Sequence, residues 1–168
     1  MIKAVLSGIL AAILVIGGAV FAKGDGERDY PEARLYDVSG DAMADVDAAL
    51  ARATETDKRV LIAFGANWCH DSRAFAGWTT SDRIGTMIEE RYELVFVNIG
   101  MPQSGDGPNL AVAERLGGED WPGTPNVLVL TAEGDLVNAD TATTWRDSAS
   151  REEDAIFDEL VKLAQKAN

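Results

Sequence analysis

The chain is poor in the side chains that proteins most often use for covalent and metal chemistry. Its 168 residues include one cysteine, Cys69, and one histidine, His70. A single cysteine excludes an internal disulfide, although proteins of oxidising compartments commonly carry paired cysteines. A closed zinc site needs four converging ligands, and consecutive side chains on a helix point about 100° apart. We therefore expect no resident metal and no bound cofactor.

Basic side chains are also scarce. The chain has 15 Lys and Arg residues against 28 Asp and Glu residues, a formal net charge of −13 at pH 7. Binding to nucleic acid or to an anionic membrane surface needs clustered lysine and arginine side chains. The composition therefore argues against a nucleic-acid partner, and the excess of acidic residues is best explained by solubility.

The longest stretch without charge is at the N-terminus. Lys3 precedes an uncharged run of 19 residues from Ala4 to Ala22, which ends in a sequence suited to signal peptidase. This pattern predicts a secretory signal peptide over residues 1–22, with cleavage after Ala22. An uncleaved anchor is the alternative, because roughly 20 apolar residues span a bilayer. Either outcome places the rest of the chain outside the cytoplasm, periplasmic or secreted, and only residues 4–22 would contact a membrane.

After the first 22 residues, the chain divides into a tether and one domain. Residues 23–40 form a tether and entry segment, polar and expected to be loose as far as about Glu32, and residues 41–168 form the domain. Apolar spacing predicts helices over 42–54, 81–90, 109–116 and 151–166, with a short helix at 71–76 that Gly77 interrupts. Apolar runs predict strands over 59–64, 92–99 and 126–131, the last continuing as a hairpin into Leu136-Val137. Strands that alternate with helices imply parallel pairing with crossovers, and the hairpin adds antiparallel pairing.

The single thiol follows the first of these strands, within Asn67-Trp68-Cys69-His70-Asp71-Ser72. A strand that delivers one thiol to a helix start suits thiol chemistry, because the unpaired N–H groups there favour the thiolate. Ser72 lies three residues on, over Cys69 on the same helical face, and is expected to donate a hydrogen bond to the sulfur. Asp71 opposes the thiolate, because two negative charges repel. The polar neighbours indicate an exposed, reactive thiol, and the alternative is a buried, inert cysteine.

A second motif, Gly123-Thr124-Pro125, comes before the predicted hairpin. Together with Trp68-Cys69 and the order of strands and helices, it resembles the thioredoxin superfamily over residues 42–166. The resemblance implies an α/β three-layer sandwich, with a central mixed β-sheet and helices on both faces. It also implies a cis peptide bond before Pro125, facing the cysteine, and it makes Trp68, Thr124 and Pro125 the substrate-binding residues.

Two residues depart from the dithiol pattern of that superfamily. Ser72 stands where a second, resolving cysteine would be, and Ala63 stands where thioredoxins carry a buried acidic residue. Because a serine oxygen cannot resolve a mixed disulfide, the resemblance implies a monothiol Cys-x-x-Ser oxidoreductase. Cys69 would form a mixed disulfide with a protein or small-thiol disulfide, Ser72 would stabilise the thiolate, and an external thiol reductant would complete turnover.

Three points stay open from the sequence. His70 either lends positive charge or a proton to the thiol site, or is simply an exposed helix-start residue. The chain is either this monothiol enzyme or a redox-inactive module of the same fold that binds peptides or assembles with a partner. A thiol peroxidase, which would form a sulfenic acid on Cys69, is a third reading.

Overall fold

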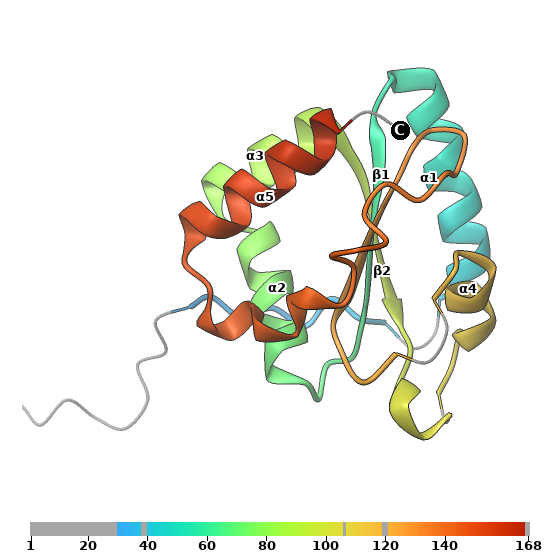
Figure 1. Cartoon of the computed structure of the whole chain (residues 1–168), viewed down its shortest axis with the longest axis vertical. Helices are drawn as coiled ribbons and strands as arrows, with labels where there is room; N and C mark the ends of the chain where they lie inside the picture. Colours follow the sequence, from blue (N-terminus) through green and yellow to red (C-terminus); the bar gives the residue numbers. More distant parts are fainter. Residues whose placement is uncertain (1–29, 38–39, 106, 119–120, 167–168) are drawn as a thin grey trace, which may run out of the picture.

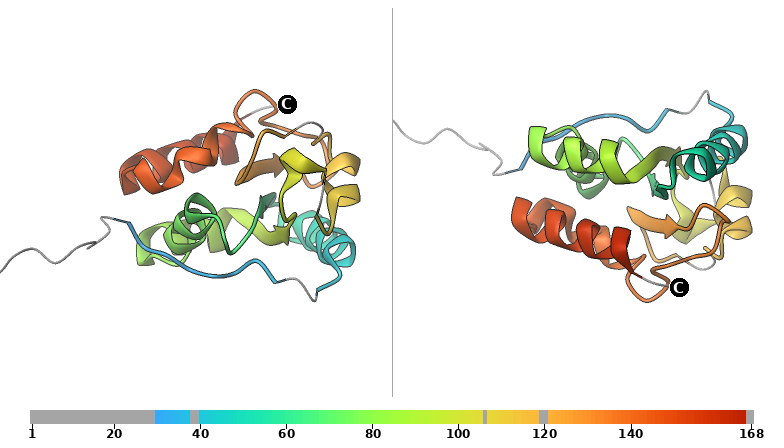
Figure 2. Two further views of the ribbon diagram at one scale, coloured as in Figure 1. Left: turned by 90° about the horizontal axis from the view of Figure 1, so that it is seen from below. Right: turned by 90° about the horizontal axis from the view of Figure 1, so that it is seen from above.

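A three-stranded β-sheet lies at the centre of the computed structural model, which describes residues 30–37, 40–105, 107–118 and 121–166. The strand order is β2-β1-β3. β1 (Arg59–Gly65) pairs in parallel with β2 (Tyr92–Asn98) and antiparallel with β3 (Asn126–Leu130). Helices cover both faces of this mixed sheet, as Figures 1 and 2 show. The predicted three-layer arrangement is therefore confirmed.

The central strand divides the core into two parts. One face of the sheet carries α2 (His70–Thr79), α3 (Asp82–Arg91) and α5 (Glu153–Gln165), and the other carries α1 (Ala42–Thr56) and α4 (Leu110–Arg115). Leu61 and Ala63 belong to the first core, while Val60, Ile62 and Phe64 belong to the second. All five side chains are fully buried. A strand covered on both faces has no position for a polar residue, which explains its unbroken apolar sequence.

The predicted hairpin is only partly present. Leu136 forms one isolated antiparallel bridge with Leu130, without a further strand. The buried side chain of Asn138 makes two hydrogen bonds to the backbone of β3. Its Oδ1 accepts from Val129 N at 2.8 Å, and its Nδ2 donates to Val127 O at 2.9 Å. An amide side chain therefore satisfies backbone groups of β3 that a fourth strand would otherwise pair.

Two short 3₁₀ helices, η1 (Pro102–Ser104) and η2 (Thr144–Ser150), were not predicted. Asn109 is the N-cap residue of α4, but its backbone is left-handed at φ 62° and its side chain makes no cap bond. Its Nδ2 instead donates to Asn98 O at 2.9 Å, which ties the loop to the end of β2.

The prediction that Gly77 ends the helix after the cysteine was wrong, since α2 continues to Thr79. Glycine costs a helix only about 1 kcal/mol, and here it allows a close approach of backbone. A Cβ at Gly77 would lie 2.3 Å from Pro31 O. Ala33 N also donates to Arg73 O at 3.0 Å. The expected loose tether is therefore packed against α2 in its described part, residues 30–32.

The predicted signal peptide or anchor over residues 1–22, and the tether residues 23–29, lie outside the described residues. Within the ranges that the structure describes, no helix is both long and apolar enough to cross a bilayer.

We expect Gly77→Ala to lower the free energy of unfolding by about 1–3 kcal/mol, because the new Cβ would overlap backbone atoms of Pro31 and Glu32. Denaturant unfolding checks this. The control is the same substitution in a chain without residues 1–32. There the atoms of Pro31 and Glu32 are gone, so the substitution should cost less, or stabilise the helix by up to about 1 kcal/mol. Equal destabilisation in both backgrounds would contradict the packing described above.

Candidate functional site

The thiol lies where β1 passes into α2. β1 ends at Gly65, and a tight turn follows in which Cys69 N donates to Ala66 O at 3.1 Å. Cys69 is the N-cap residue of α2, with extended backbone angles (φ −80°, ψ 126°), and its carbonyl accepts from Arg73 N at 3.1 Å. The structure therefore contains the predicted succession of strand, thiol and helix.

The Thr124-Pro125 loop covers the sulfur. The peptide bond between these two residues is cis, as the resemblance implied. Cys69 Sγ donates to Thr124 O at 3.3 Å, and the residue is only 7% exposed. The prediction of an exposed thiol was therefore wrong, because it considered polar neighbours in sequence and not a loop 55 residues away.

This contact also changes the expected role of the helix start. The Cys69 side chain makes no hydrogen bond to the N–H groups of α2. A thiol can donate to a carbonyl oxygen, whereas a thiolate has no proton to donate. The sulfur must therefore give up its bond to Thr124 O when it ionises, and the helix N–H groups become its alternative partners.

Ser72 is fully buried and does not bond to the sulfur. Its Oγ accepts a hydrogen bond from Ala66 N at 3.4 Å. A Cβ at Gly65 would lie 2.7 Å from this oxygen, so the serine side chain rests on the end of β1. The expected hydrogen bond from Ser72 to Cys69 is absent from this arrangement, in which the sulfur is a donor to Thr124.

His70 and Asp71 interact with each other at the start of α2. His70 Nε2 lies 3.1 Å from Asp71 Oδ2, and the histidine side chain is 65% exposed. Asp71 is buried, and its Oδ1 accepts from Ala149 N at 2.9 Å, which connects α2 to η2. The structure therefore joins His70 to a carboxylate and gives no hydrogen bond between the imidazole and Cys69. Among the described residues, no cluster of His, Cys, Asp and Glu suits a metal ion.

Trp68 is the exposed member of the four tryptophans. It is 56% exposed and its Nε1 donates to Gly100 O at 3.3 Å, while the other three indole side chains are buried. In the described part of the chain, the large apolar side chains that are exposed are Leu35, Trp68 and Met101. Leu35 and Trp68 line one shallow pocket of about 550 Å³, and Met101 follows the carbonyl that holds the indole. We call these three exposed side chains, Leu35, Trp68 and Met101, the apolar rim; Trp68 directly precedes Cys69 in the chain.

The residues before the domain supply a part of the site that the sequence did not reveal. The Asn67 side chain bonds both sides of the Tyr36 backbone: Oδ1 accepts from Tyr36 N at 3.2 Å and Nδ2 donates to Tyr36 O at 2.8 Å. The Arg73 guanidinium bonds the Glu32 carboxylate and the carbonyls of Asn67 and Trp68. Residues 30–37 are thereby attached to the turn that carries Cys69.

Tyr36 is the buried side chain of this segment, at 1% exposed. Its ring meets Phe96 edge-on, with 5.2 Å between ring centroids, and crosses the end of β1 at Gly65. Its hydroxyl has no hydrogen-bond partner of normal geometry. Burial above all raises the pKa of Tyr36, the nearby Cys69 raises it further, and the Ser72 side chain acts in the opposite direction. The hydroxyl therefore remains protonated at neutral pH, next to the thiol site.

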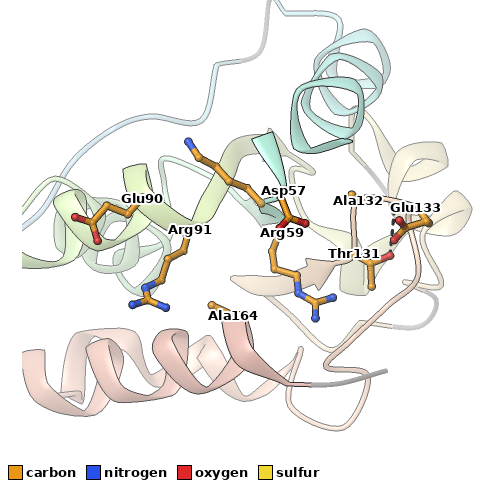
Figure 3. A pocket seen from close by; sticks show the side chains of 9 residues that line it. Asp57, Arg59, Glu90, Arg91, Thr131, Ala132, Glu133 and Ala164 are labelled. Carbon is orange, nitrogen blue, oxygen red and sulfur yellow. Dashed lines mark hydrogen bonds between the residues drawn. The ribbon is translucent and has the colours of Figure 1, made fainter. Parts of the chain in front are cut away.

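Another pocket, of about 460 Å³, lies at the far end of the sheet (Figure 3). It is lined by Asp57, Lys58, Arg59, Glu90, Arg91, Thr131, Ala132, Glu133 and Ala164. β1 begins at this pocket and ends before the thiol, and a seven-residue strand spans about 20 Å. None of the predicted site residues lines this pocket.

A family model and a solved structure are similar to this chain. A family model described as thioredoxin-like matches residues 41–132, which include β1, Trp68-Cys69 and Thr124-Pro125. The crystal structure of a disulphide isomerase from Xylella fastidiosa Temecula1 is similar, with a TM-score of 0.71 and 27% sequence identity over 79% of this chain and 98% of that chain. Proteins with curated descriptions give no significant match.

Tyr36 makes folding stability depend on alkaline pH. An unfolded tyrosine ionises near pH 10, whereas burial raises the pKa of Tyr36 in the folded chain. The stabilisation is therefore complete below about pH 10 and is lost as the pH rises further. We expect the free energy of unfolding, measured by denaturant titration, to fall as the pH rises above about 10, and Tyr36→Phe to reduce this fall. Tyr92→Phe, at a second tyrosine whose pKa burial raises, should reduce the fall as well, and the double variant should reduce it more than either single variant. If Tyr36→Phe keeps the pH dependence of the wild type, Tyr36 is not a source of the alkaline loss of stability.

Proposed function

The chain belongs to the thioredoxin-like family, and we propose that it is a monothiol thiol-disulfide oxidoreductase that acts outside the cytoplasm through Cys69. The observation that carries this proposal is the contact of 3.3 Å between the single thiol and Thr124 O, in the loop that faces the helix start. The similarity to a disulphide isomerase supports the same class of chemistry. Since Cys69 is the single cysteine, no second thiol of this chain can take part.

The proposed reaction needs two exchanges. Cys69 loses its proton to solvent and attacks one sulfur of a substrate disulfide, so that a Cys69–substrate disulfide forms and the other substrate sulfur leaves as a thiolate. An external thiolate then attacks the substrate sulfur of this mixed disulfide, which forms a new disulfide and releases the Cys69 thiolate. The chain itself is neither oxidised nor reduced over the cycle. The reductant is therefore a separate thiol.

The surface around the sulfur supports a protein substrate. The apolar rim of Leu35, Trp68 and Met101 is exposed, and Trp68 directly precedes Cys69, so a peptide can bury an apolar side chain there. Thr124 lies against the sulfur, and an extended substrate backbone can pair with the loop that it belongs to. We assign substrate binding to Trp68, Thr124 and Pro125 for these reasons. His70 keeps only a proposed supporting role, through its exposed position beside Cys69.

The uncharged run over residues 4–22 supports a place outside the cytoplasm. As a cleaved signal it releases a periplasmic or secreted protein, and as an anchor it attaches the domain to the membrane. The strongly acidic composition gives no support to a nucleic-acid partner.

A second candidate function has its own observation. Cys69 is 7% exposed and its proton is engaged by Thr124 O, which also suits a structural cysteine in a redox-inactive, peptide-binding module. The apolar rim would then be the functional surface and the thiol only a part of its support.

A trapping experiment tests the oxidoreductase. The reduced protein should form a mixed disulfide with a small disulfide reagent at pH 7, faster than free cysteine does, and an external thiol should release it. Cys69→Ser should form none. Ser72→Cys, as the matched variant, should gain an internal disulfide, because residues i and i+3 at a helix start are within bridging distance. Reaction no faster than free cysteine, and only at alkaline pH, would sink the proposal.

Peptide binding distinguishes the two candidates. If the chain is a binding module, Cys69→Ala should retain the affinity of the wild type for an unfolded model protein. Trp68→Ala should weaken that affinity by about 3–10-fold in either case, because the exposed indole offers the largest apolar contact of the rim. Titration calorimetry with the reduced protein measures both. An unchanged affinity in Trp68→Ala would show that the apolar rim does not bind the substrate or peptide in either candidate function.

A further inference from the structure

We infer that Tyr36 is a positioning residue of the thiol site: its buried hydroxyl orients Ser72, so that the serine proton is directed to the Cys69 sulfur when that sulfur is an anion. The inference rests on the proposed monothiol function and extends it. It assigns a part in the chemistry to residues 30–37, which lie outside the matched region 41–132.

The first step is the proximity of the two hydroxyl groups. Gly65 is the last residue of β1. A Cβ added to it would lie 2.6 Å from Tyr36 Cζ and 2.7 Å from Ser72 Oγ. Cζ is the ring carbon that bears the phenol oxygen. Tyr36 Cζ and Ser72 Oγ therefore lie within about 5.3 Å of each other over Gly65, in a space that exists only because this residue has no side chain.

The second step concerns the number of hydrogen bonds that Ser72 can make. A hydroxyl offers one proton and two acceptor lone pairs. Ser72 Oγ already accepts from Ala66 N at 3.4 Å. If Tyr36 O–H supplies the second accepted bond, both lone pairs are used and the serine proton must find an acceptor of its own.

The third step identifies that acceptor. Cys69 is the N-cap of α2 and Ser72 is the third helical residue, the pair of positions whose side chains and backbone exchange bonds at many helix starts. The resting thiol donates to Thr124 O and offers little to a donor. The thiolate has lost that bond and is a strong acceptor. It arises twice in the proposed cycle, as the attacking group and as the group released from the mixed disulfide.

In the resting structure the Tyr36 hydroxyl has no hydrogen-bond partner, so its bond to Ser72 would form only when the sulfur ionises. A fully buried hydroxyl without a hydrogen bond is unfavourable and calls for an explanation. Donors that are placed for a charge that appears only during reaction are a recurrent feature of active sites. The two bonds of the Asn67 side chain to the Tyr36 backbone hold this donor in place.

The test is the pH dependence of the reaction between Cys69 and a small disulfide reagent, measured on the full domain. In Tyr36→Phe, which retains the ring, we expect the pH of half-maximal rate to rise by about half a unit to one unit. The rate at pH 7 should then fall about 3–10-fold. Ser72→Ala should show a shift of similar size. Because the two hydroxyl groups act in series, the double variant should shift no further than Ser72→Ala alone.

The controls separate this inference from a purely structural role and from the function itself. Phe96→Leu loosens the packing of the Tyr36 ring but keeps its hydroxyl, and it should leave the pH of half-maximal rate unchanged. If Tyr36→Phe keeps the wild-type pH profile, or if the two shifts add, the inference is wrong while the oxidoreductase stands. If the wild type itself forms no mixed disulfide, the proposed function fails first.

Discussion

β1 is buried on both faces, and this burial fixes the position of the turn and the helix start that follow its last residue. Five successive side chains of the strand are fully buried between two cores, so the end of the strand has little freedom to shift. The turn from Ala66 to Cys69 leads directly from that end into α2. The sulfur therefore has a defined position against the Thr124-Pro125 loop, which enters β3 on the neighbouring edge of the same strand.

The surroundings of the sulfur cover the thiol at rest and offer other hydrogen-bond donors once it ionises. In the resting state, the thiol is covered and donates to Thr124 O. Ionisation breaks this bond and leaves the helix start as the polar surroundings of the sulfur. A substrate that displaces the loop contact would thus create the conditions in which the nucleophile forms. Trp68, the residue before Cys69, exposes its indole to solvent.

Residues 30–37 join the site through contacts that are polar at the surface and apolar beneath it. Arg73 and Asn67 bind the backbone and the Glu32 carboxylate of this segment, while Tyr36 is inserted over Gly65. Small residues make both approaches possible: Gly65 leaves room for the tyrosine ring, and Gly77 leaves room for the Pro31 carbonyl. The entry segment is therefore structurally a part of the domain in its described portion.

The sequence by itself determined the order of the elements, the mixed sheet between two helical layers, and the succession of strand, thiol and helix. Each of these depends on local spacing of apolar residues or on two short motifs. Only the tertiary structure decided that Cys69 is covered, that Ser72 faces Ala66, and that Tyr36 belongs to the site. These contacts join residues that are up to 55 positions apart in the chain, and packing of the two cores selects them. The pattern of neighbouring residues carries no information about which distant side chain will fill the space that a glycine leaves.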